Sequence, residues 1–329
     1  MSGGPQRVPE EADVARSARA AAPPASAGLS PVPQAFFAPA AAGRAAGPAG
    51  QRRSRRLRWG TLAVHAVLIA VCALVILPLL WMALTAFKSH DQVFTHSPWW
   101  IPPSSHLGEN IRQVFSRVPL GRYFLNSLAV STAITLLDLF FSTLAGYALA
   151  KYRFRGRDAI FGAIVATMMV PFIVILIPQY IIVRDLGWLD TYAALILPFA
   201  VSSFGIFMMR QAFADTPDEL IDAARIDGAG EWRILFRIVV PLHVPALVSL
   251  AILRFLSEWD SLLWPLVATN SEGMRTLSLG LALLQDDRYG TDMPQLMTAA
   301  TLAVLPIILV YAFLQRYFIK SAAGAGLKQ

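Results

Sequence analysis

The chain has 329 residues, of which 56% are hydrophobic and 15% are charged, and its formal net charge is +7. Soluble proteins carry about 25% charged residues, so this composition indicates a protein that crosses a membrane several times. It excludes a disordered chain, a collagen-like fibre and a disulfide-rich secreted scaffold. The single cysteine, Cys72, excludes an internal disulfide and a cysteine-based metal cluster.

The first 58 residues differ in composition from the rest of the chain. Residues 1–50 contain 16 Ala, 8 Pro and 6 Gly and have no apolar periodicity. Such a segment buries too little apolar surface to offset its ordering entropy, so we expect a disordered tail over 1–58. The tail ends in a cluster of five arginines at 52–58. The cluster is typical of a cytoplasmic anchor before a membrane helix, an interpretation that we favour over nucleic-acid binding.

Residues 59–329 are predicted to form an all-α membrane domain. A membrane-spanning helix needs about 20 mostly apolar residues. Six stretches meet this requirement, and we expect prolines to kink several of them. The predicted spans are 62–84, 125–149, 160–182, 191–209, 243–268 and 294–314.

The positions of Lys and Arg predict the orientation of the spans. With the N-terminus in the cytoplasm, the inner segments from residue 52 onward hold 16 basic residues and the outer segments hold 7. Basic residues concentrate on the cytoplasmic side of membrane proteins. The sequence therefore predicts a multi-pass protein of the cell membrane with both termini in the cytoplasm.

One predicted inner loop, residues 213–242, has features of its own. Thr216, Pro217 and Glu219 form the pattern of a capping box at the start of a helix, which we expect Gly228 to end in a left-handed conformation. We expect a second short helix to follow. The pair either lies in the lipid interface or inserts into a groove of a cytoplasmic partner, and physical arguments alone leave both interpretations open.

The same loop resembles the EAA loop of permease subunits of ABC importers. That motif reads Glu-Ala-Ala, three residues, Gly, nine residues, Ile-x-Leu-Pro, and this chain has Asp222 and Val240 where the motif has Glu and Leu. The segments Gly146-Tyr147-Ala148 and 186–192 also resemble this family. The C-terminal residues 315–318 and 323–328 are similar to the tail of its carbohydrate-uptake branch, on the side of the maltose-type second permease. The resemblance implies contacts with an ATPase through residues 217–240. The implied contact residues are Glu219, Asp222, Ala223, Ala224, Asp227, Gly228, Ile238 and Pro241.

The family implies a set of partner chains. They are a second permease subunit, two cytoplasmic ATPases that bind ATP and Mg, and an extracytoplasmic solute-binding protein. The chain has no phosphate-loop motif, so we expect it to bind no cofactor itself. The implied function is to form half of the translocation pathway for a sugar or oligosaccharide. The alternatives are a permease for another solute, such as a peptide, an amino acid or a phosphate ester, and an intramembrane enzyme, which no motif supports.

Polar residues inside the predicted spans suggest two further groups. Carbohydrate sites combine hydroxyl-bonding groups with apolar faces, which makes five residues of spans three to five candidates for the solute pathway: Gln179, Tyr180, Ser202, Ser203 and Glu258. Asp138 and Arg254 lie near the middle of spans two and five, where an unpaired charge costs about 2.5–3.5 kcal/mol. Arg254 either pairs only with Glu258 four residues later or forms an Asp138–Arg254–Glu258 network. No histidines have metal-ligand spacing, so no metal site is expected.

Overall fold

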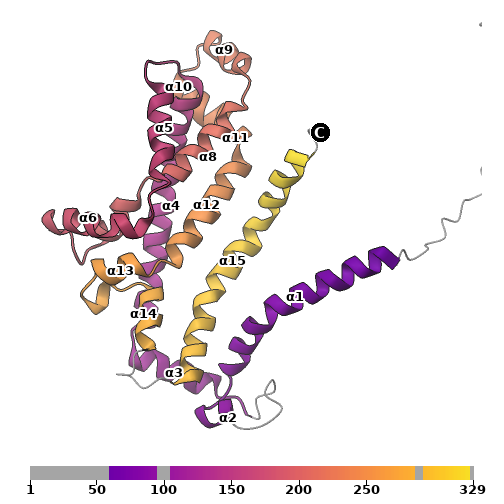
Figure 1. The fold of residues 1–329 in the computed structure, drawn as a ribbon, viewed down its shortest axis with the longest axis vertical. Helices are drawn as coiled ribbons and strands as arrows, with labels where there is room; N and C mark the ends of the chain where they lie inside the picture. Colours follow the sequence, from indigo (N-terminus) through magenta and orange to yellow (C-terminus); the bar gives the residue numbers. More distant parts are fainter. Residues whose placement is uncertain (1–58, 95–103, 286–291, 327–329) are drawn as a thin grey trace, which may run out of the picture. The chain divides into compact units, whose positions relative to one another are not determined.

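The computed structural model describes residues 59–94, 104–285 and 292–326, and all of its regular elements there are helical. The chain divides into the units Met1–Trp59 and Gly60–Gln329. The predicted tail 1–58 lies outside the described residues, so its disorder stays a prediction. Figure 1 shows the helices in chain order.

The first four helices include the two long ones that meet the requirements of a membrane span. They are α1 (Trp59–Thr85), α2 (His90–Phe94), α3 (Leu107–Arg117) and α4 (Leu120–Lys151). Every described residue from Gly60 to Trp81 is exposed in this chain, and all of these are apolar or small except Thr61 and His65. In contrast, α4 packs on α8, α12, α14 and other helices and forms the centre of the bundle.

The next elements are shorter because prolines and glycines interrupt the apolar segments. They are α5 (Arg157–Thr167), α6 (Phe172–Asp185), α7 (Tyr192–Ile196), the 3-10 turn η3 (Leu197–Phe199), α8 (Ser203–Ala214) and α9 (Asp218–Ile226). Predicted span 160–182 is interrupted at one of its prolines, since α5 and α6 meet at 100° around Pro171. Predicted span 191–209 is also broken, with a bend of 41° before α8.

The remaining elements complete the bundle. They are α10 (Glu231–Ile234), the π-helical turn η4 (Leu235–Val239), α11 (Val240–Leu242), α12 (Val244–Trp259), α13 (Leu263–Ala268), the 3-10 turn η5 (Glu272–Met274), α14 (Leu277–Leu284) and α15 (Met293–Gly326). Predicted span 243–268 is likewise interrupted, because α12 ends at Trp259 and α13 begins at Leu263. Spans 62–84, 125–149 and 294–314 each lie within one helix.

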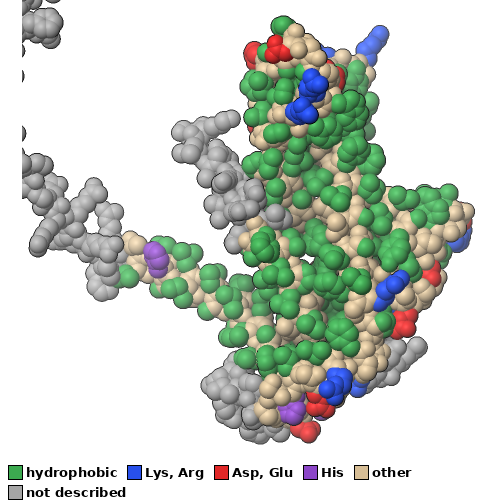
Figure 2. Space-filling view, turned by 180° about the vertical axis from the view of Figure 1, so that it is seen from behind, with side chains coloured by type: hydrophobic (Ala, Val, Ile, Leu, Met, Phe, Trp, Pro, Cys, Tyr) green, Lys and Arg blue, Asp and Glu red, His purple; other side chains and the backbone are tan. Residues whose placement is uncertain are grey.

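The described residues therefore contain three helices that can cross a membrane alone, or up to six spans if each bent pair counts as one. Hydrophobic side chains cover most of the visible sides of the helices, and charged side chains gather at the top and bottom of the bundle and on the arm at its right edge (Figure 2). This distribution matches an apolar membrane between two aqueous phases.

Close contacts between helices depend on small residues. A Cβ atom on Gly146 of α4 would lie 2.7 Å from the Cβ of Met209 and 2.9 Å from the backbone nitrogen of Arg210 on α8. Small residues allow helix backbones to approach in membranes, where no hydrophobic effect drives helices together. Gly146 thus fixes the contact between α4 and α8.

At the end of the bundle opposite the 213–242 loop, polar bonds join α4 to the segment before α14. Asn126 Nδ2 donates to the carbonyls of Gly273 (2.8 Å) and Arg275 (2.9 Å), and the Ser127 hydroxyl accepts from the Leu277 N–H (2.8 Å). The Asp190 carboxylate accepts from the backbone N–H groups of Asn270 and Ser271 (both 2.9 Å). These bonds lower the pKa of Asp190 below its usual value.

Candidate functional site

The loop 213–242 folds as two helical segments joined by glycines. Gly228 has φ of 77°, so it ends α9 in the left-handed conformation that the sequence predicts. The Ala229 N–H donates to Ala224 O (2.9 Å) and the Gly228 N–H to Arg225 O (3.0 Å), which are the two bonds of a Schellman motif.

The predicted capping box at the start of this loop is wrong. Pro217 is the residue that precedes α9, and no side chain caps the helix. The Thr216 hydroxyl instead hydrogen-bonds Nε2 of His243 at 2.8 Å, between α8 and α12. The Thr216 side chain therefore bonds His243, which is distant in sequence, and does not cap α9 as the local pattern predicts.

The two faces of α9 differ in burial, and Leu220 and Ala223 do not share the buried face with Ala224. Ile221 and Ala224 are buried at 2% and 8% exposure, in a core with residues of α4, α8 and α12. Leu220 and Ile226 are 41% and 86% exposed. The implied ATPase contacts divide accordingly: Ala224 is buried, Ile238 is half-buried, and the others are exposed, namely Glu219, Asp222, Ala223, Asp227, Gly228 and Pro241.

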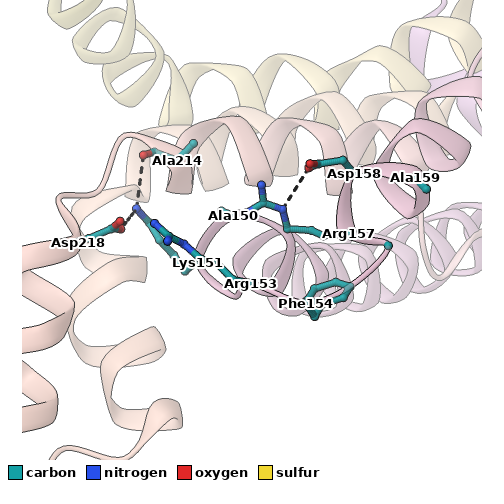
Figure 3. Close-up of a pocket in the computed structure, with 10 residues that line it drawn as sticks. Ala150, Lys151, Arg153, Phe154, Arg157, Asp158, Ala159, Ala214 and Asp218 are labelled. Atoms are coloured by element: carbon teal, nitrogen blue, oxygen red, sulfur yellow. Dashed lines mark hydrogen bonds and ion pairs between the residues drawn. The ribbon is translucent and has the colours of Figure 1, made fainter. Parts of the chain in front are cut away.

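Lys151, the last residue of α4, holds the start of the loop. Its side chain is only 6% exposed. Its Nζ donates to the Thr216 carbonyl, to the Ala214 carbonyl (3.5 Å) and to Asp218 Oδ1 (2.7 Å) (Figure 3). The hydrogen bond from Lys151 lowers the pKa of Asp218. Lys151, Ala214 and Asp218 border a 590 Å³ pocket that Arg153 and Arg157 also line.

A second set of bonds holds the middle of the loop to α4. The Tyr147 hydroxyl donates to Glu231 Oε2 at 3.2 Å, and Arg225 Nε donates to Glu231 Oε1 at 2.9 Å. Arg225 Nη1 also donates to Asp222 Oδ1 at 3.1 Å. Sequence reasoning missed the roles of Lys151, Tyr147 and Glu231, because hydrogen-bond partners this far apart in sequence leave no local pattern.

The expected second α-helix of the loop is mostly a π-helical turn. Only Glu231–Ile234 is α-helical before η4 begins. Ile234, Leu235 and Val239 are 0%, 3% and 0% exposed and pack into the same core as Ile221. Leu235 and Val239, four residues apart, both face this core, which attaches this half of the loop to the bundle.

The structure also brings Asp138, Arg254 and Glu258 together. Arg254 Nε lies 3.3 Å from Asp138 Oδ2, and Nη1 lies 2.8 Å from Glu258 Oε1. The Asp138 and Glu258 side chains are 0% and 9% exposed. Arg254 Nη2 also donates to the carbonyl of Phe199 at 2.8 Å. The Arg254 Nε–H makes no hydrogen bond, so its contact with Asp138 is an ion pair alone.

Asp138 also fixes the start of α8. Its Oδ1 accepts from the Ser202 N–H (2.7 Å) and the Ser142 hydroxyl (2.8 Å), and its Oδ2 accepts from the Ser202 hydroxyl (2.7 Å). Ser202 caps α8 by accepting from the Gly205 N–H at 2.9 Å. A buried carboxylate therefore joins α4, α8 and α12 at the bend before α8.

The five residues predicted for the solute pathway lie in different surroundings. Asp138, Arg254 and Glu258 form a charge cluster, to which Glu258 belongs and Ser202 is bonded. Ser203 hydrogen-bonds Thr167 at 2.6 Å. Tyr180 lines a 320 Å³ hollow with Leu176, Ile177 and Val267. Gln179 Nε2 is buried without a hydrogen-bond partner. Among the described residues, no group of His, Cys, Asp and Glu is arranged to hold a metal ion.

Comparison with known proteins agrees with the family resemblance. Arabinooligosaccharides transport system permease protein AraQ of Halalkalibacterium halodurans is 36% identical over 260 residues, which cover 78% of this chain and 93% of that protein. The sn-glycerol-3-phosphate transport system permease protein UgpE of Brucella abortus is 34% identical, covering 78% and 93%.

A solved structure is also similar. It is a crystal structure of a bacterial ABC transporter involved in the import of the acidic polysaccharide alginate, with 26% identity, a TM-score of 0.70, and coverage of 80% of this chain and 98% of that chain. The model of the family described as binding-protein-dependent transport system inner membrane component matches residues 142–323, more than half of the chain. The chain therefore belongs to this family of inner-membrane transport components.

Proposed function

We propose that this chain is a permease subunit of an ABC importer for an oligosaccharide and forms half of its translocation pathway. It is a transport subunit and not an enzyme. The observation that carries the proposal is the exposed face of α9. The start of this helix is bonded to Lys151 of α4, and its end is linked to Tyr147 of α4 through Arg225 and Glu231. AraQ and the alginate importer, two similar proteins, are named for oligosaccharide or polysaccharide transport, which supports this class of solute.

The proposed partners are a second permease subunit, two cytoplasmic ATPases that bind ATP and Mg, and an extracytoplasmic solute-binding protein. Six spans with both termini in the cytoplasm fit the excess of Lys and Arg on the side of the α9 loop. The exposed face of α9, with Leu220, Ala223 and Ile226, contacts an ATPase. Movement of that ATPase shifts α4 through Lys151 and Tyr147, and the bundle opens alternately to the two sides of the membrane.

Among the predicted solute residues, Gln179 and Tyr180 are the ones that this chain leaves available. Gln179 has an unpaired amide, and Tyr180 borders an apolar hollow, whereas Ser202 and Glu258 are bonded within the charge cluster. Amide groups and aromatic rings are side chains that suit a sugar, since they offer hydrogen bonds and an apolar face.

The runner-up is a permease for a phosphate ester, and the similarity to UgpE is the observation that favours it. The two functions are distinguished by reconstituting the chain with its partner permease, ATPase and binding protein in proteoliposomes. We expect neutral oligosaccharides to stimulate ATP hydrolysis and to accumulate. Stimulation by glycerol phosphate alone would replace the proposed solute with the alternative.

A further inference from the structure

The second half of the loop carries an exposed pair of aromatic side chains. Trp232 and Phe236 are 65% and 40% exposed, although Ile234 and Leu235 between them are buried. The two rings are stacked, with centroids 5.8 Å apart and planes at 5°. An apolar surface of this kind on a folded protein usually contacts a partner or a membrane.

Trp232, one member of the aromatic pair, lies beside the last turns of α4. Trp232 and Leu235 line a 230 Å³ groove with Leu144, Tyr147 and Ala148 of that helix. At about 1.5 Å per residue, Leu144 lies about 10 Å inside the end of α4 at Lys151. Figure 1 shows α9 beyond the ends of the other helices, and α10 closer to the bundle. The two halves of the loop thus lie at different depths.

The groove continues the outward apolar surface of α4. Leu136, Phe140 and Phe141 on that surface are 62%, 44% and 41% exposed, and Leu144 and Ala148 follow them at helical spacing. Because α4 has the length and composition of a membrane-spanning helix, its exposed apolar side chains face lipid or another membrane helix.

Two arginines accompany the aromatic pair. Arg233 and Arg237 directly follow Trp232 and Phe236, and both are exposed. Neither side chain makes a hydrogen bond or ion pair with any residue that the structure describes. Tryptophan prefers the boundary between the apolar and polar layers of a membrane, and guanidinium groups bind phosphate oxygens there.

We infer that Trp232, Phe236, Arg233 and Arg237 form a lipid anchor, in which the rings enter the interfacial layer and the arginines bind anionic phospholipid headgroups. The anchor holds the second half of the loop in the membrane surface, while α9, beyond the Gly228 bend, stays free for the ATPase. Two observations favour a membrane over the partner permease. The groove beside Trp232 continues the exposed apolar surface of α4, and the side chains of Arg233 and Arg237 have no acidic partner among the described residues. The inference depends on membrane insertion, and not on which solute is carried or on α9 docking.

Site-directed spin labelling tests the anchor. Cys72 is the single cysteine, so Cys72→Ser gives a background for Trp232→Cys, Phe236→Cys and the matched control Ile226→Cys, which is 86% exposed on α9. The complete transporter is placed in nanodiscs of phosphatidylethanolamine and phosphatidylglycerol. Collisions of each nitroxide with oxygen and with a water-soluble nickel chelate are then measured.

We expect the labels at 232 and 236 to favour oxygen over the nickel chelate severalfold, and the label at 226 to lack this preference. Preference for nickel at 232 and 236 would overturn the anchor, and so would protection from both reagents, which would place the rings against a protein partner. A label at 226 that reacts freely with nickel while the ATPase is bound would contradict the docking of α9 and leave the anchor intact.

The contact of the two arginines with lipid headgroups is tested separately, with a control variant. The double variant Arg233→Gln/Arg237→Gln is compared with Arg155→Gln, another exposed arginine near the end of α4. We expect the oxygen preference at 232 to fall severalfold in the double variant, or when phosphatidylcholine replaces phosphatidylglycerol, and to be unchanged in Arg155→Gln. An oxygen preference that neither change reduces would overturn the headgroup contact.

Discussion

Gly228 and Gly230 lie two residues apart and differ in the conformation that each requires. Gly228 has φ of 77°, whereas Gly230 has φ of −72°. A Cβ atom on either would meet no described residue within 4 Å other than its chain neighbours. An L-residue in the left-handed region costs about 1–2 kcal/mol. The need for glycine at 228 therefore comes from the backbone turn and from any partner that approaches it.

The first prediction compares the same substitution at these two glycines. Gly228→Val is expected to insert in the membrane but to lose the ATPase on purification, because the Schellman turn that ends α9 is strained. Gly230→Val, whose backbone is in the extended region, is expected to retain the ATPase. Recovery of equal amounts of ATPase with both variants would show that the turn does not matter for docking.

In the charge cluster, replacing one residue is also expected to have a large effect on stability. Removing one partner of a buried ion pair costs about 3–5 kcal/mol, since the other charge is left uncompensated. Asp138 has the additional task of binding the Ser202 N–H and hydroxyl at the start of α8. Its loss is therefore expected to affect more than its pairing with Arg254.

A double-mutant cycle tests this pairing. Asp138→Ala and Arg254→Met are each expected to destabilise the chain by about 3–5 kcal/mol, and the double variant by clearly less than their sum. Denaturant unfolding in detergent is the measurement. Asp260→Ala, an exposed acid at the end of α12, serves as the control and should change little. Additive effects of the two cluster variants would reject the pairing.

At the scale of elements, α4 is the helix to which the others are attached. It contacts α8 through Gly146, carries Asp138 at its middle, and binds the α9 loop through Tyr147 and Lys151. Near its other end, Asn126 holds the segment before α14. One continuous helix thus contacts both ends of the bundle.

The close contact between α4 and α8 predicts that replacing a glycine with alanine has opposite effects on stability at two helical positions. Gly146→Ala is expected to destabilise by about 1–3 kcal/mol, because its Cβ meets backbone atoms that cannot move away alone. Gly162→Ala on α5 has open space and is expected to stabilise by up to about 1 kcal/mol through helix propensity. Thermal unfolding compares them, and equal shifts would contradict the close contact.

Because Lys151 attaches the start of the α9 loop to α4, replacing it is expected to destabilise α9 locally. Lys151→Met leaves the part-buried Thr216 carbonyl without this donor, which costs about 1–3 kcal/mol. We expect amide hydrogen exchange in α9 to rise by about tenfold or more, since about 1.4 kcal/mol corresponds to a factor of ten. Arg153→Met, two residues on and exposed, is the control. Unchanged exchange in Lys151→Met would show that other contacts hold the loop.

The elements also show what the sequence can predict. Apolar length predicted α1, α4 and α15 as single helices, and Gly228 predicted the end of α9. Prolines predicted interruptions, but the 100° angle at Pro171 depends on packing between helices that lie far apart in sequence. The capping box failed for the same reason, because His243 binds Thr216 across the fold.

At the scale of the whole molecule, composition and charge predicted a multi-pass membrane protein, and the loop motif predicted its family. The motif indicated which loop is functional but not which face of it is exposed. That face follows from the burial of Ile221 and Ala224, and the attachment to α4 follows from Lys151 and Tyr147. Candidate solute contacts were the least predictable, because a polar residue in a span can serve either packing or transport.

The central claim is that the α9 loop, held by α4, couples ATP hydrolysis to solute movement. The most direct measurement is the amount of oligosaccharide accumulated per ATP hydrolysed in proteoliposomes that contain the complete transporter. We predict that the double variant Tyr147→Phe/Lys151→Met retains its ATPase and hydrolyses ATP but accumulates severalfold less solute per ATP than the wild type. An unchanged ratio would contradict the claim.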